Sequence, residues 1–397
     1  MNDTDVVVVG GGATGAGVAR DLATRGLAVT LVERDRLATG ASGAMHGLLH
    51  SGGRYAVAEP DSARRCIAEN RTLREIAPDC IEPTDGLFAS LSEDPDDYVD
   101  ELLDGCRASG IPAERLDGDA AREREPGLSD AVEAAVAVPD AAIDPIRLVA
   151  ANALAAERAD ATIRQGVAVT DLLVEAGRVV GVELDGTATL RADCVVNAAG
   201  AWAGELAALA DVPVPMRPSR GAMTVTERRH VEGVVNRCRP KTSGDILVPS
   251  GDASILGTTD VAVDDPDDYP TEPWEVDLLF EELEPVVPSL ADADVAHTYW
   301  GVRPLYDPAE EDSPTDFSRG FSLLDHAKRD DRPGFVSIVG GKLTTYRAMA
   351  EATADAVCDR LDVSAACRTA DEPLPDADAA MERFDLEELL AATRVRA

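Results

Sequence analysis

The first thirty residues follow the pattern of a buried strand, a turn and a helix. Val6–Val9 is an unbroken run of β-branched residues, which is typical of a strand buried on both faces of a parallel sheet. Gly10–Gly15 follows, and a helical pattern of apolar positions then continues to Gly26, where glycine ends the helix. Ala28–Val32 is a second apolar run. The pattern therefore predicts a β-α-β unit at the start of the chain.

Beyond this unit the pattern predicts two interleaved domains. We expect helices over about 62–77 and 146–158, strands at Asp85–Ser92 and Phe335–Val339, a loop at Pro139–Pro145, and a meander of strands over 162–196 that ends in the buried run Cys194–Asn197. Residues 213–320 change to short strands, prolines and acidic loops, which suits an antiparallel substrate domain. The tail from Pro373 is acidic and alanine-rich and has no core of its own.

The chain carries an unusual charge. Its 397 residues include 74 Asp and Glu but only 37 Lys and Arg, a formal net charge of −37. Such a surface repels nucleic acid and anionic lipid headgroups, and it destabilises the fold by self-repulsion unless salt screens it. We therefore hypothesise a protein adapted to a salt-rich cytoplasm. Only three lysines occur, Lys241, Lys328 and Lys342, and each is a candidate for a position that arginine cannot fill.

Cysteine spacing and the lack of long apolar stretches limit the class of protein. The seven cysteines are scattered and form no C-x-x-C pair, which argues against a zinc or iron–sulfur site and against a disulfide framework. No basic segment precedes the first apolar run, and no stretch of 18 or more apolar residues occurs. We expect a soluble cytoplasmic protein without a metal site.

The segment Gly10–Gly15 has the spacing G-x-G-x-x-G of a dinucleotide-binding turn. The first glycine permits the tight turn, the second lets the backbone approach a pyrophosphate, and the third lets helix and strand pack closely. The pyrophosphate then lies at the helix N-terminus, where free N–H groups favour an anion. Glu33 ends the next strand, where it can accept both ribose hydroxyls. This motif alone leaves FAD and NAD open.

Three further segments favour FAD. Val195–Trp202 is a buried strand that ends in small residues, so the chain can pass close to a nucleotide. Gly340–Arg347 places two glycines and Lys342 at a helix N-terminus, where backbone amides could stabilise a reduced isoalloxazine ring. Gly40–Tyr55 is rich in small residues, which marks backbone pressed against a ligand.

Taken in order, these four segments resemble the FAD-dependent glycerol-3-phosphate dehydrogenases. The detail of His46–Tyr55, Asn236–Arg239, Asp245–Pro249 and Gly301–Leu305 is most similar to the A subunits of the anaerobic enzymes, and the resemblance covers about residues 4–371. It implies an α/β fold with a glutathione-reductase-like FAD-binding Rossmann domain interleaved with an antiparallel α+β substrate domain. The expected bounds are 1–85, 145–212 and 320–370 for the FAD domain, 86–144 and 213–319 for the substrate domain, and 371–397 for the tail.

The resemblance also implies site residues. It gives FAD contacts at the following positions: Gly10, Gly12, Ala13, Thr14, Gly15, Glu33, Arg34, Gly40, Ser42, His46, Gly47, Leu49, Val167, Ala199, Gly200, Trp202, Gly341, Lys342, Leu343 and Thr344. Its anion-binding set is Arg54, Arg303, Arg319 and Lys342, with Tyr55 in the same pocket. Arginine suits a phosphate because its planar fork binds two oxygens at once. The catalytic residues expected are His50, Arg303 and Lys342, with His50 as the candidate base.

The implied reaction is hydride transfer from C2 of sn-glycerol 3-phosphate to flavin N5, which gives dihydroxyacetone phosphate. Electrons would leave through partner subunits to a quinone, so the chain would lie in the cytoplasm or on the inner face of the membrane. Relatives of this kind usually continue into a cysteine-rich domain for a [2Fe-2S] cluster, whose cysteines this sequence lacks. Two alternatives remain open: a flavin amino-acid oxidase of the same fold, and a non-catalytic subunit that relays electrons.

Overall fold

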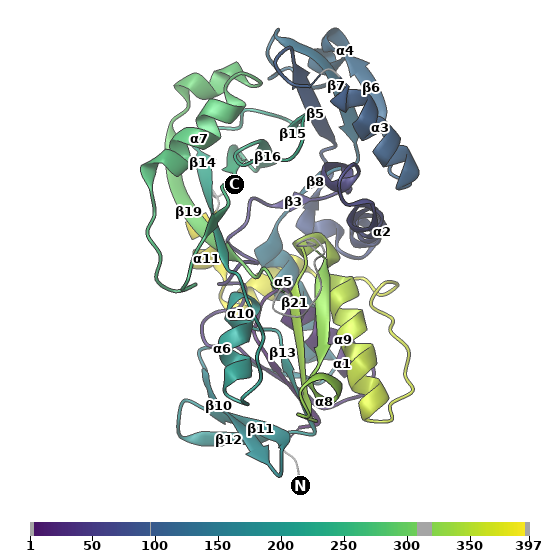
Figure 1. Cartoon of the computed structure of the whole chain (residues 1–397), viewed down its shortest axis with the longest axis vertical. Coiled ribbons are helices and arrows are strands. Elements are labelled where there is room, and N and C mark those ends of the chain that lie inside the picture. The colour runs from purple at the N-terminus through teal and green to yellow at the C-terminus, as the bar shows by residue number, and fades with distance from the viewer. Residues whose placement is uncertain (1–3, 96, 308–319, 394–397) are drawn as a thin grey trace.

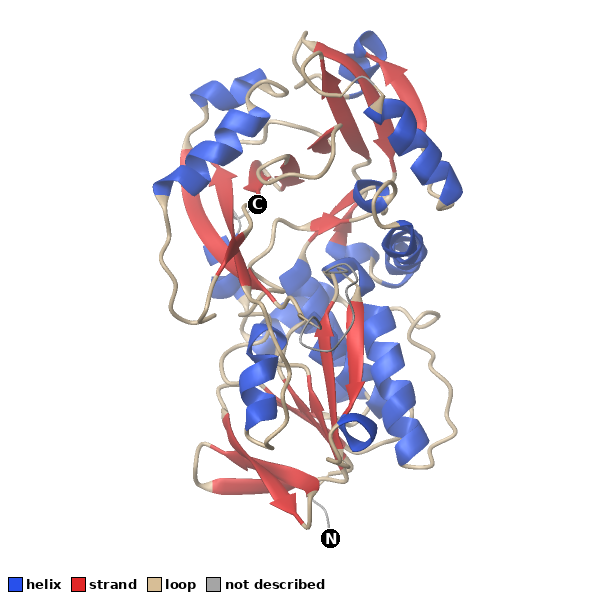
Figure 2. Cartoon of the chain, in the orientation of Figure 1, coloured by secondary structure: helices blue, strands red, loops and turns tan. Residues whose placement is uncertain are grey.

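The computed structural model describes residues 4–95, 97–307 and 320–393. Within them, two large sheets occupy the two halves of the molecule (Figures 1 and 2). A mainly parallel sheet fills the lower half of the view, and a longer mixed sheet fills the upper half. A small three-stranded sheet lies between them.

The first sheet has six strands in the order β20-β21-β13-β1-β2-β9. Five run parallel, and β20 pairs antiparallel with β21. Side chains of β1 alternate between two cores, with Val6 and Val8 in one and Val7 and Val9 in the other. The unbroken β-branched run is therefore a strand buried on both faces, as predicted. The strands are β1 (Val6–Val9), β2 (Val29–Val32), β9 (Thr162–Arg164), β13 (Cys194–Asn197), β20 (Phe321–Asp325) and β21 (Phe335–Gly340).

Helices cover one face of this sheet and a smaller sheet covers the other (Figure 1). The covering helices, which confirm the predicted ones, are α1 (Ala13–Thr24), α5 (Pro145–Arg158) and α9 (Tyr346–Arg360). The meander predicted at 162–196 forms the opposite layer together with α6 (Ala203–Ala208); its strands are β10 (Val169–Glu175), β11 (Arg178–Leu184) and β12 (Ala188–Arg191). The helix α8 (His326–Arg329) follows β20.

The second sheet has nine strands drawn from two stretches of the chain. Its strands are β5 (Gly86–Leu91), β6 (Glu114–Asp117), β7 (Val132–Val138), β14 (Ser219–Thr226), β15 (Val234–Arg237), β16 (Ile246–Ser250), β17 (Ala253–Gly257), β18 (Val261–Ala262) and β19 (Val295–Arg303). Its pairs are antiparallel as predicted, except that β15 runs parallel to β5 where the two stretches meet. The helices packed around it are α2 (Pro60–Ile76), α3 (Tyr98–Ala108), α4 (Gly118–Arg124) and α7 (Pro273–Leu283).

The loop predicted at Pro139–Pro145 is partly wrong, because it contains the strand β8 (Ala141–Ile143). This strand lies between β3 (Leu48–Leu49) and β4 (Ile81–Glu82) and pairs antiparallel with both. Three residues are too few to show a period of two, and both partners are distant in sequence. Only the folded chain therefore reveals the strand.

The C-terminal segment packs against the hydrophobic core between the first sheet and the helices α1, α5 and α9, which we call the first core. It forms α10 (Ala377–Phe384), which contacts α5, and α11 (Glu387–Thr393). Met381 and Phe384 are buried in the same core as α1 and α9. The sequence pattern did not reveal this contact, and the domain bounds given above stay predictions. None of the described helices is long and apolar enough to cross a membrane.

Arginine neutralises most of the buried acidic groups. Five buried ion pairs join distant or neighbouring segments: Arg25–Asp21, Arg54–Asp245, Arg220–Glu275, Arg237–Asp94 and Arg347–Glu69. Burying an unpaired carboxylate would be costly, so these arginines are tied to structural positions. Most remaining carboxylates face solvent, where they repel one another.

We therefore expect stability to depend on salt. Raising KCl from about 0.1 M to about 1 M shortens the Debye length from about 10 Å to about 3 Å and weakens the repulsion between exposed carboxylates. The thermal unfolding midpoint, followed by circular dichroism, should rise with KCl over this range. An unchanged midpoint would contradict this expectation.

Candidate functional site

Two adjoining cavities lie at the carboxyl ends of the strands of the first sheet. The larger has a volume of about 640 Å³ and the smaller about 350 Å³. They share a set of lining residues, so they form one long site: Ala13, Thr14, Ala41, Ser42, Pro304, Gly340 and Met349. Ligands of open α/β sheets bind at this edge, and the length of the site suits an elongated ligand.

The turn between β1 and α1 brings the backbone against the larger cavity. Gly10 has a φ of +111°, and a Cβ there would lie 2.4 Å from the carbonyl oxygen of Ala198. A Cβ at Gly15 would lie 1.9 Å from the carbonyl oxygen of Gly10. The helix α1 begins at Gly12 without a side-chain cap of its own and has no acidic residue in its first turn. Its positive end therefore suits a pyrophosphate.

Glu33 lies at the end of β2 and lines the larger cavity. One carboxylate oxygen accepts a hydrogen bond from the amide of Gly11 at 2.6 Å, and the other accepts from the amide of Asp35 at 2.9 Å. These bonds hold the carboxylate beside the glycine turn. It retains acceptor sites toward the cavity, which fits the expected ribose contact.

The turn after β13 is fixed by a buried polar network. Asn197 donates to the hydroxyl of Ser337 at 3.1 Å and accepts from the amide of Ala199 at 3.2 Å. Ser337 also contacts Nε2 of His326 at 2.8 Å, and burial lowers the pKa of this histidine. Asn197 is the last residue of β13, so the network ties the end of this strand to the following turn, which lines the larger cavity.

A contact between the two halves of the molecule forms part of the wall of the larger cavity. Arg34 forms a bidentate ion pair with Asp267, whose oxygens lie 2.6 and 3.0 Å from its guanidinium nitrogens. Asp267 also accepts from the indole of Trp202 at 2.8 Å, and the guanidinium of Arg34 lies 4.3 Å from the indole ring centre. The bond from Arg34 lowers the pKa of Asp267. We call these three residues the clasp.

The structure brings most of the predicted cofactor residues together. Twelve line the larger cavity: Gly10, Gly12, Ala13, Thr14, Glu33, Arg34, Gly40, Ser42, Val167, Ala199, Gly200 and Trp202. His46, Gly341, Lys342 and Leu343 line the smaller one.

Four predicted cofactor residues line neither cavity: Gly15, Gly47, Leu49 and Thr344. Gly15 permits helix packing, and Leu49 belongs to the first core. The carbonyl of Gly47 accepts from Ile143, and the hydroxyl of Thr344 accepts from the amide of His50. For these four residues a contact with FAD stays a prediction.

Cationic side chains gather around the smaller cavity. Lys342 has its Nζ 4.3 Å from the ring centre of Tyr55 and 3.3 Å from the hydroxyl of Ser62. Arg303, on β19, donates to the carbonyl of Thr259 at 2.6 Å and lies 3.7 Å from Asp260. These residues come from widely separated parts of the chain. Arg319, the remaining member of the predicted anion-binding set, lies outside the described residues.

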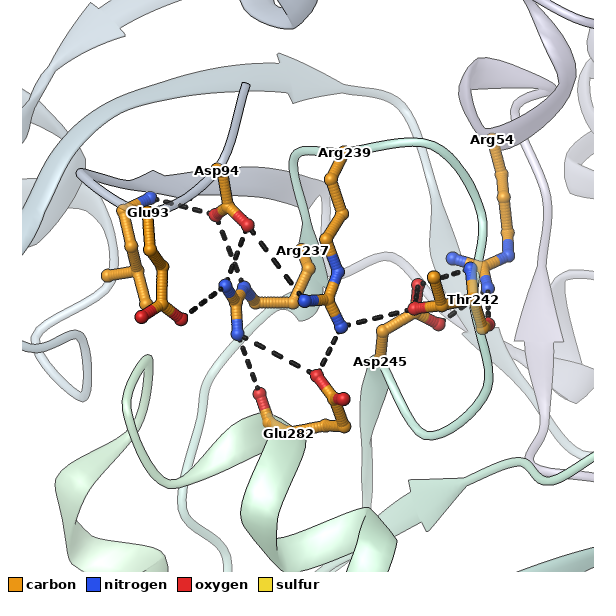
Figure 3. A network of polar contacts seen from close by, with 9 residues as sticks. Arg54, Glu93, Asp94, Arg237, Arg239, Thr242, Asp245 and Glu282 are labelled. Atoms are coloured by element: carbon orange, nitrogen blue, oxygen red, sulfur yellow. Dashed lines mark hydrogen bonds and ion pairs between the residues drawn. The ribbon is translucent and has the colours of Figure 1, made fainter. Parts of the chain in front are cut away.

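Arg54 lines the smaller cavity but also has a structural partner. Its guanidinium contacts Asp245 at 2.5 Å and the carbonyl of Thr242 at 3.1 Å (Figure 3). Both ionic side chains are buried. Because Asp245 neutralises much of its charge, Arg54 is less suited to bind a free anion than the sequence indicates.

His50 lies at the base of the smaller cavity and is buried. Its ring centre lies 5.3 Å from that of Tyr55 and 6.1 Å from that of His46. His46 accepts from the amide of Leu48 through Nδ1 at 3.1 Å, which orients its ring. The imidazole of His50 therefore lines the same cavity as Lys342 and Arg303 and packs against Tyr55.

The cysteines take no part in this arrangement. Burial raises the pKa of the Cys66, Cys80, Cys106 and Cys238 thiols to about 12, so they stay protonated. Across the three described ranges, no group of three or more His, Cys, Asp or Glu is placed to hold a metal ion.

Comparison with known proteins identifies the family. A family model described as FAD dependent oxidoreductase matches residues 5–355. The chain belongs to this FAD dependent oxidoreductase family. It is 56% identical to the A1 subunit of the anaerobic glycerol-3-phosphate dehydrogenase of Haloferax volcanii, over 94% of this chain and 66% of that protein. It is 46% identical to the A subunit of the corresponding Escherichia coli enzyme, over 94% of this chain and 70% of that protein.

These identities confirm the resemblance expected from the motifs. The chain spans about two thirds of the length of the curated relatives it matches. Among solved structures, the glycerol-3-phosphate dehydrogenase from Bacillus halodurans complexed with FAD matches with a TM-score of 0.72 and 27% identity, covering 97% of this chain and 71% of that one. The predicted fold class is confirmed.

FAD is the cofactor of this oxidoreductase family, and the larger cavity fits it. The N-terminus of α1 suits the pyrophosphate, with the hydroxyl of Ser42 accepting from the amide of Ala13, and Glu33 suits the adenosine ribose. The larger cavity adjoins the smaller one, which gives the site the length that a dinucleotide needs. The first motif left FAD and NAD open, and membership of this family identifies FAD.

Two residues that line the cavities, Asp267 and Lys241, were not among the site residues predicted from the sequence. Asp267 sits on an acidic loop whose neighbours are also acidic, so nothing in the sequence distinguishes it. Lys241 lines the smaller cavity beside Lys342. The scarcity of lysine could have pointed to Lys241, because two of the three lysines of this oxidoreductase line the smaller cavity.

The clasp predicts a specific effect on FAD retention. Asp267→Asn removes the charge that holds Arg34, and a partly exposed ion pair of this kind contributes up to about 1 kcal/mol, or about 5-fold in dissociation rate. FAD should therefore leave the variant about 2- to 5-fold faster, measured as recovery of flavin fluorescence after dilution. Asp264→Asn, an exposed residue of the same loop, serves as the charge-matched control. Equal release rates for the two variants would remove the clasp from FAD retention.

Proposed function

We propose that this chain catalyses the FAD-dependent oxidation of sn-glycerol 3-phosphate to dihydroxyacetone phosphate. The observation that carries the proposal is the gathering of Lys241, Lys342 and Arg303 around the smaller cavity of a chain with net charge −37. The cations of this cavity suit a phosphate dianion. The names of the two relatives agree with this substrate.

The residues of the smaller cavity have different roles in the proposed reaction. Lys342 and Arg303 bind the phosphate, and the ring of Tyr55 lies beside both Lys342 and His50. His50 accepts the proton of the C2 hydroxyl as the C2 hydrogen leaves with its electron pair, which converts the alcohol to a ketone. FAD, when bound, supplies the hydride acceptor at flavin N5. The backbone around Gly341 lies at the N-terminus of a short helix and favours the negative charge of a reduced ring.

The electrons then pass to a quinone through partner subunits at the membrane surface. The relatives are named as subunits, which supports an assembly with other chains. The acidic surface disfavours direct binding to anionic lipid, so we propose that contact with the membrane is made by the partners, from the cytoplasmic side.

An amino-acid oxidase of the same fold is the second candidate, since its architecture would be shared. A carboxylate carries one charge and needs one arginine, whereas the smaller cavity brings several cations together. The relay subunit is the third candidate, and it requires no substrate cavity. The cations therefore favour the phosphorylated alcohol over both.

An anaerobic titration separates the three candidates. Adding sn-glycerol 3-phosphate to the FAD-loaded protein should rapidly remove the visible absorbance of oxidised flavin, because the substrate reduces the ring. Bleaching by an amino acid but not by sn-glycerol 3-phosphate would establish the oxidase instead. Bleaching by neither would leave the relay subunit.

Arg303→Ala tests the phosphate contact. Loss of a charge-assisted hydrogen-bond pair should cost about 1.5–3 kcal/mol and raise the apparent KM for sn-glycerol 3-phosphate roughly 10- to 150-fold. Arg303 also bonds the 258–259 turn, so Arg303→Lys is made alongside to keep a positive charge, and the folding of both is checked by circular dichroism. Arg158→Ala, at the exposed end of α5, is the control. An unchanged KM in a folded Arg303→Ala protein would exclude Arg303 from the phosphate site.

A further inference from the structure

The segment Cys238–Gly244 connects β15 to β16 and forms part of the wall of the smaller cavity. We call it the 238–244 loop. Its residues Lys241, Thr242 and Ser243 line the cavity. None of these residues belonged to the site expected from the sequence, and the loop differs from an ordinary surface connection in how it is held.

Buried ion pairs fix the loop at both ends (Figure 3). At its start, Arg237 contacts Asp94 at 2.7 Å, and both side chains are only 1% exposed. Arg239, inside the loop, pairs with Glu282 of α7. At its end, Asp245 pairs with Arg54 at 2.5 Å.

Three separate parts of the chain therefore anchor one short loop. Arg54 binds it twice, since its guanidinium also contacts the carbonyl of Thr242 at 3.1 Å. The carboxylate of Asp245 in turn accepts from the amide of Thr242 at 3.3 Å. These contacts leave little freedom for the backbone next to Lys241.

Stability alone does not explain so many buried charges. Desolvation of two ions often cancels their attraction, and an apolar pair of similar volume would stabilise the fold as well or better. Such networks can instead fix one conformation. We infer that the network sets the position of the residues at the tip of the 238–244 loop.

Lys241, at the tip of the loop, is one of only three lysines in the chain. Nζ of Lys241 lies 5.7 Å from the ring centre of Tyr55, and Nζ of Lys342 lies 4.3 Å from the same centre. Since these distances add to 10.0 Å, the two ammonium groups lie no farther apart than that. The third lysine, Lys328, is exposed on α8 and pairs with Asp325.

Two ammonium groups within 10.0 Å of each other repel, and an anion bound near both lowers that repulsion. A lysine offers a compact charge with three donors, which suits a phosphate oxygen at the edge of a cavity. Arginine supplies most of the positive charge of the chain, but two of its three lysines line the same cavity.

We propose that Lys241 binds the substrate phosphate opposite Lys342, and that the ion pairs of the 238–244 loop act as positioning residues for it. This proposal rests on the proposed function for the identity of the substrate. The contact it assigns is additional to the anion-binding set expected from the sequence.

The test compares Lys241→Met with Lys328→Met, which makes the same substitution outside the cavity. The Lys241 variant should raise the KM for sn-glycerol 3-phosphate about 10-fold or more while kcat changes little, because the lost contact is to the phosphate and not to the reacting carbon. The inhibition constant of inorganic phosphate should rise as well, and Lys241→Arg should restore part of both. An unchanged KM and unchanged phosphate inhibition in Lys241→Met would overturn the proposal.

A failure of the proposed function gives a different result. If the wild-type protein does not oxidise sn-glycerol 3-phosphate, binding of inorganic phosphate to the FAD-loaded protein is measured by calorimetry instead. Weaker phosphate binding in Lys241→Met than in Lys328→Met would still support an anion site at Lys241. Equal binding in both variants would overturn it.

A double-mutant cycle tests the positioning role of the ion pairs. Glu282→Gln keeps the shape of the side chain but weakens its hold on Arg239, so KM should rise while Lys241 is present. In the Lys241→Met background the same change should have little further effect, since the positioned group is gone. Effects of Glu282→Gln that are equal in both backgrounds would show that the network does not act through Lys241.

Discussion

The arrangement of charge is the constraint on which the site depends. A chain with net charge −37 has to admit an anionic cofactor and, as proposed, a phosphorylated substrate. Arginines are largely used in pairs with carboxylates, as in Arg237–Asp94 and Arg347–Glu69. Two of the three lysines face the smaller cavity. Positive charge is therefore present at the smaller cavity within a chain whose net charge otherwise repels anions.

The two large sheets divide the site between cofactor and substrate. The first sheet supplies the glycine turn, Glu33 and the N-terminus of α1 for FAD. The second sheet supplies Arg303 and the 238–244 loop to the smaller cavity. Asp267 of the second half also contacts Arg34 at the larger cavity. Both halves therefore contribute residues to both cavities. The cofactor and substrate sites consequently depend on how the two halves pack.

Local patterns predicted the parts of the structure that depend on local sequence. The strand Val6–Val9, the glycine turn and Glu33 follow from spacing and periodicity, and most of the residues that the family resemblance named line one of the two cavities. The strand β8 was missed because both of its partners are distant in sequence. The ion pair of Arg54 with Asp245 joins residues 191 positions apart. No local pattern reveals such a partner, and it gives Arg54 a structural role as an anchor of the 238–244 loop beside its anion contact, which stays a prediction.

A structure of the protein with FAD and sn-glycerol 3-phosphate under anaerobic conditions tests the account most directly. It should show the phosphate between Lys342, Arg303 and Lys241, and the C2 hydroxyl within hydrogen-bond distance of the His50 imidazole. A phosphate bound away from these cations, or a C2 hydroxyl remote from both His50 and the flavin, would contradict the account.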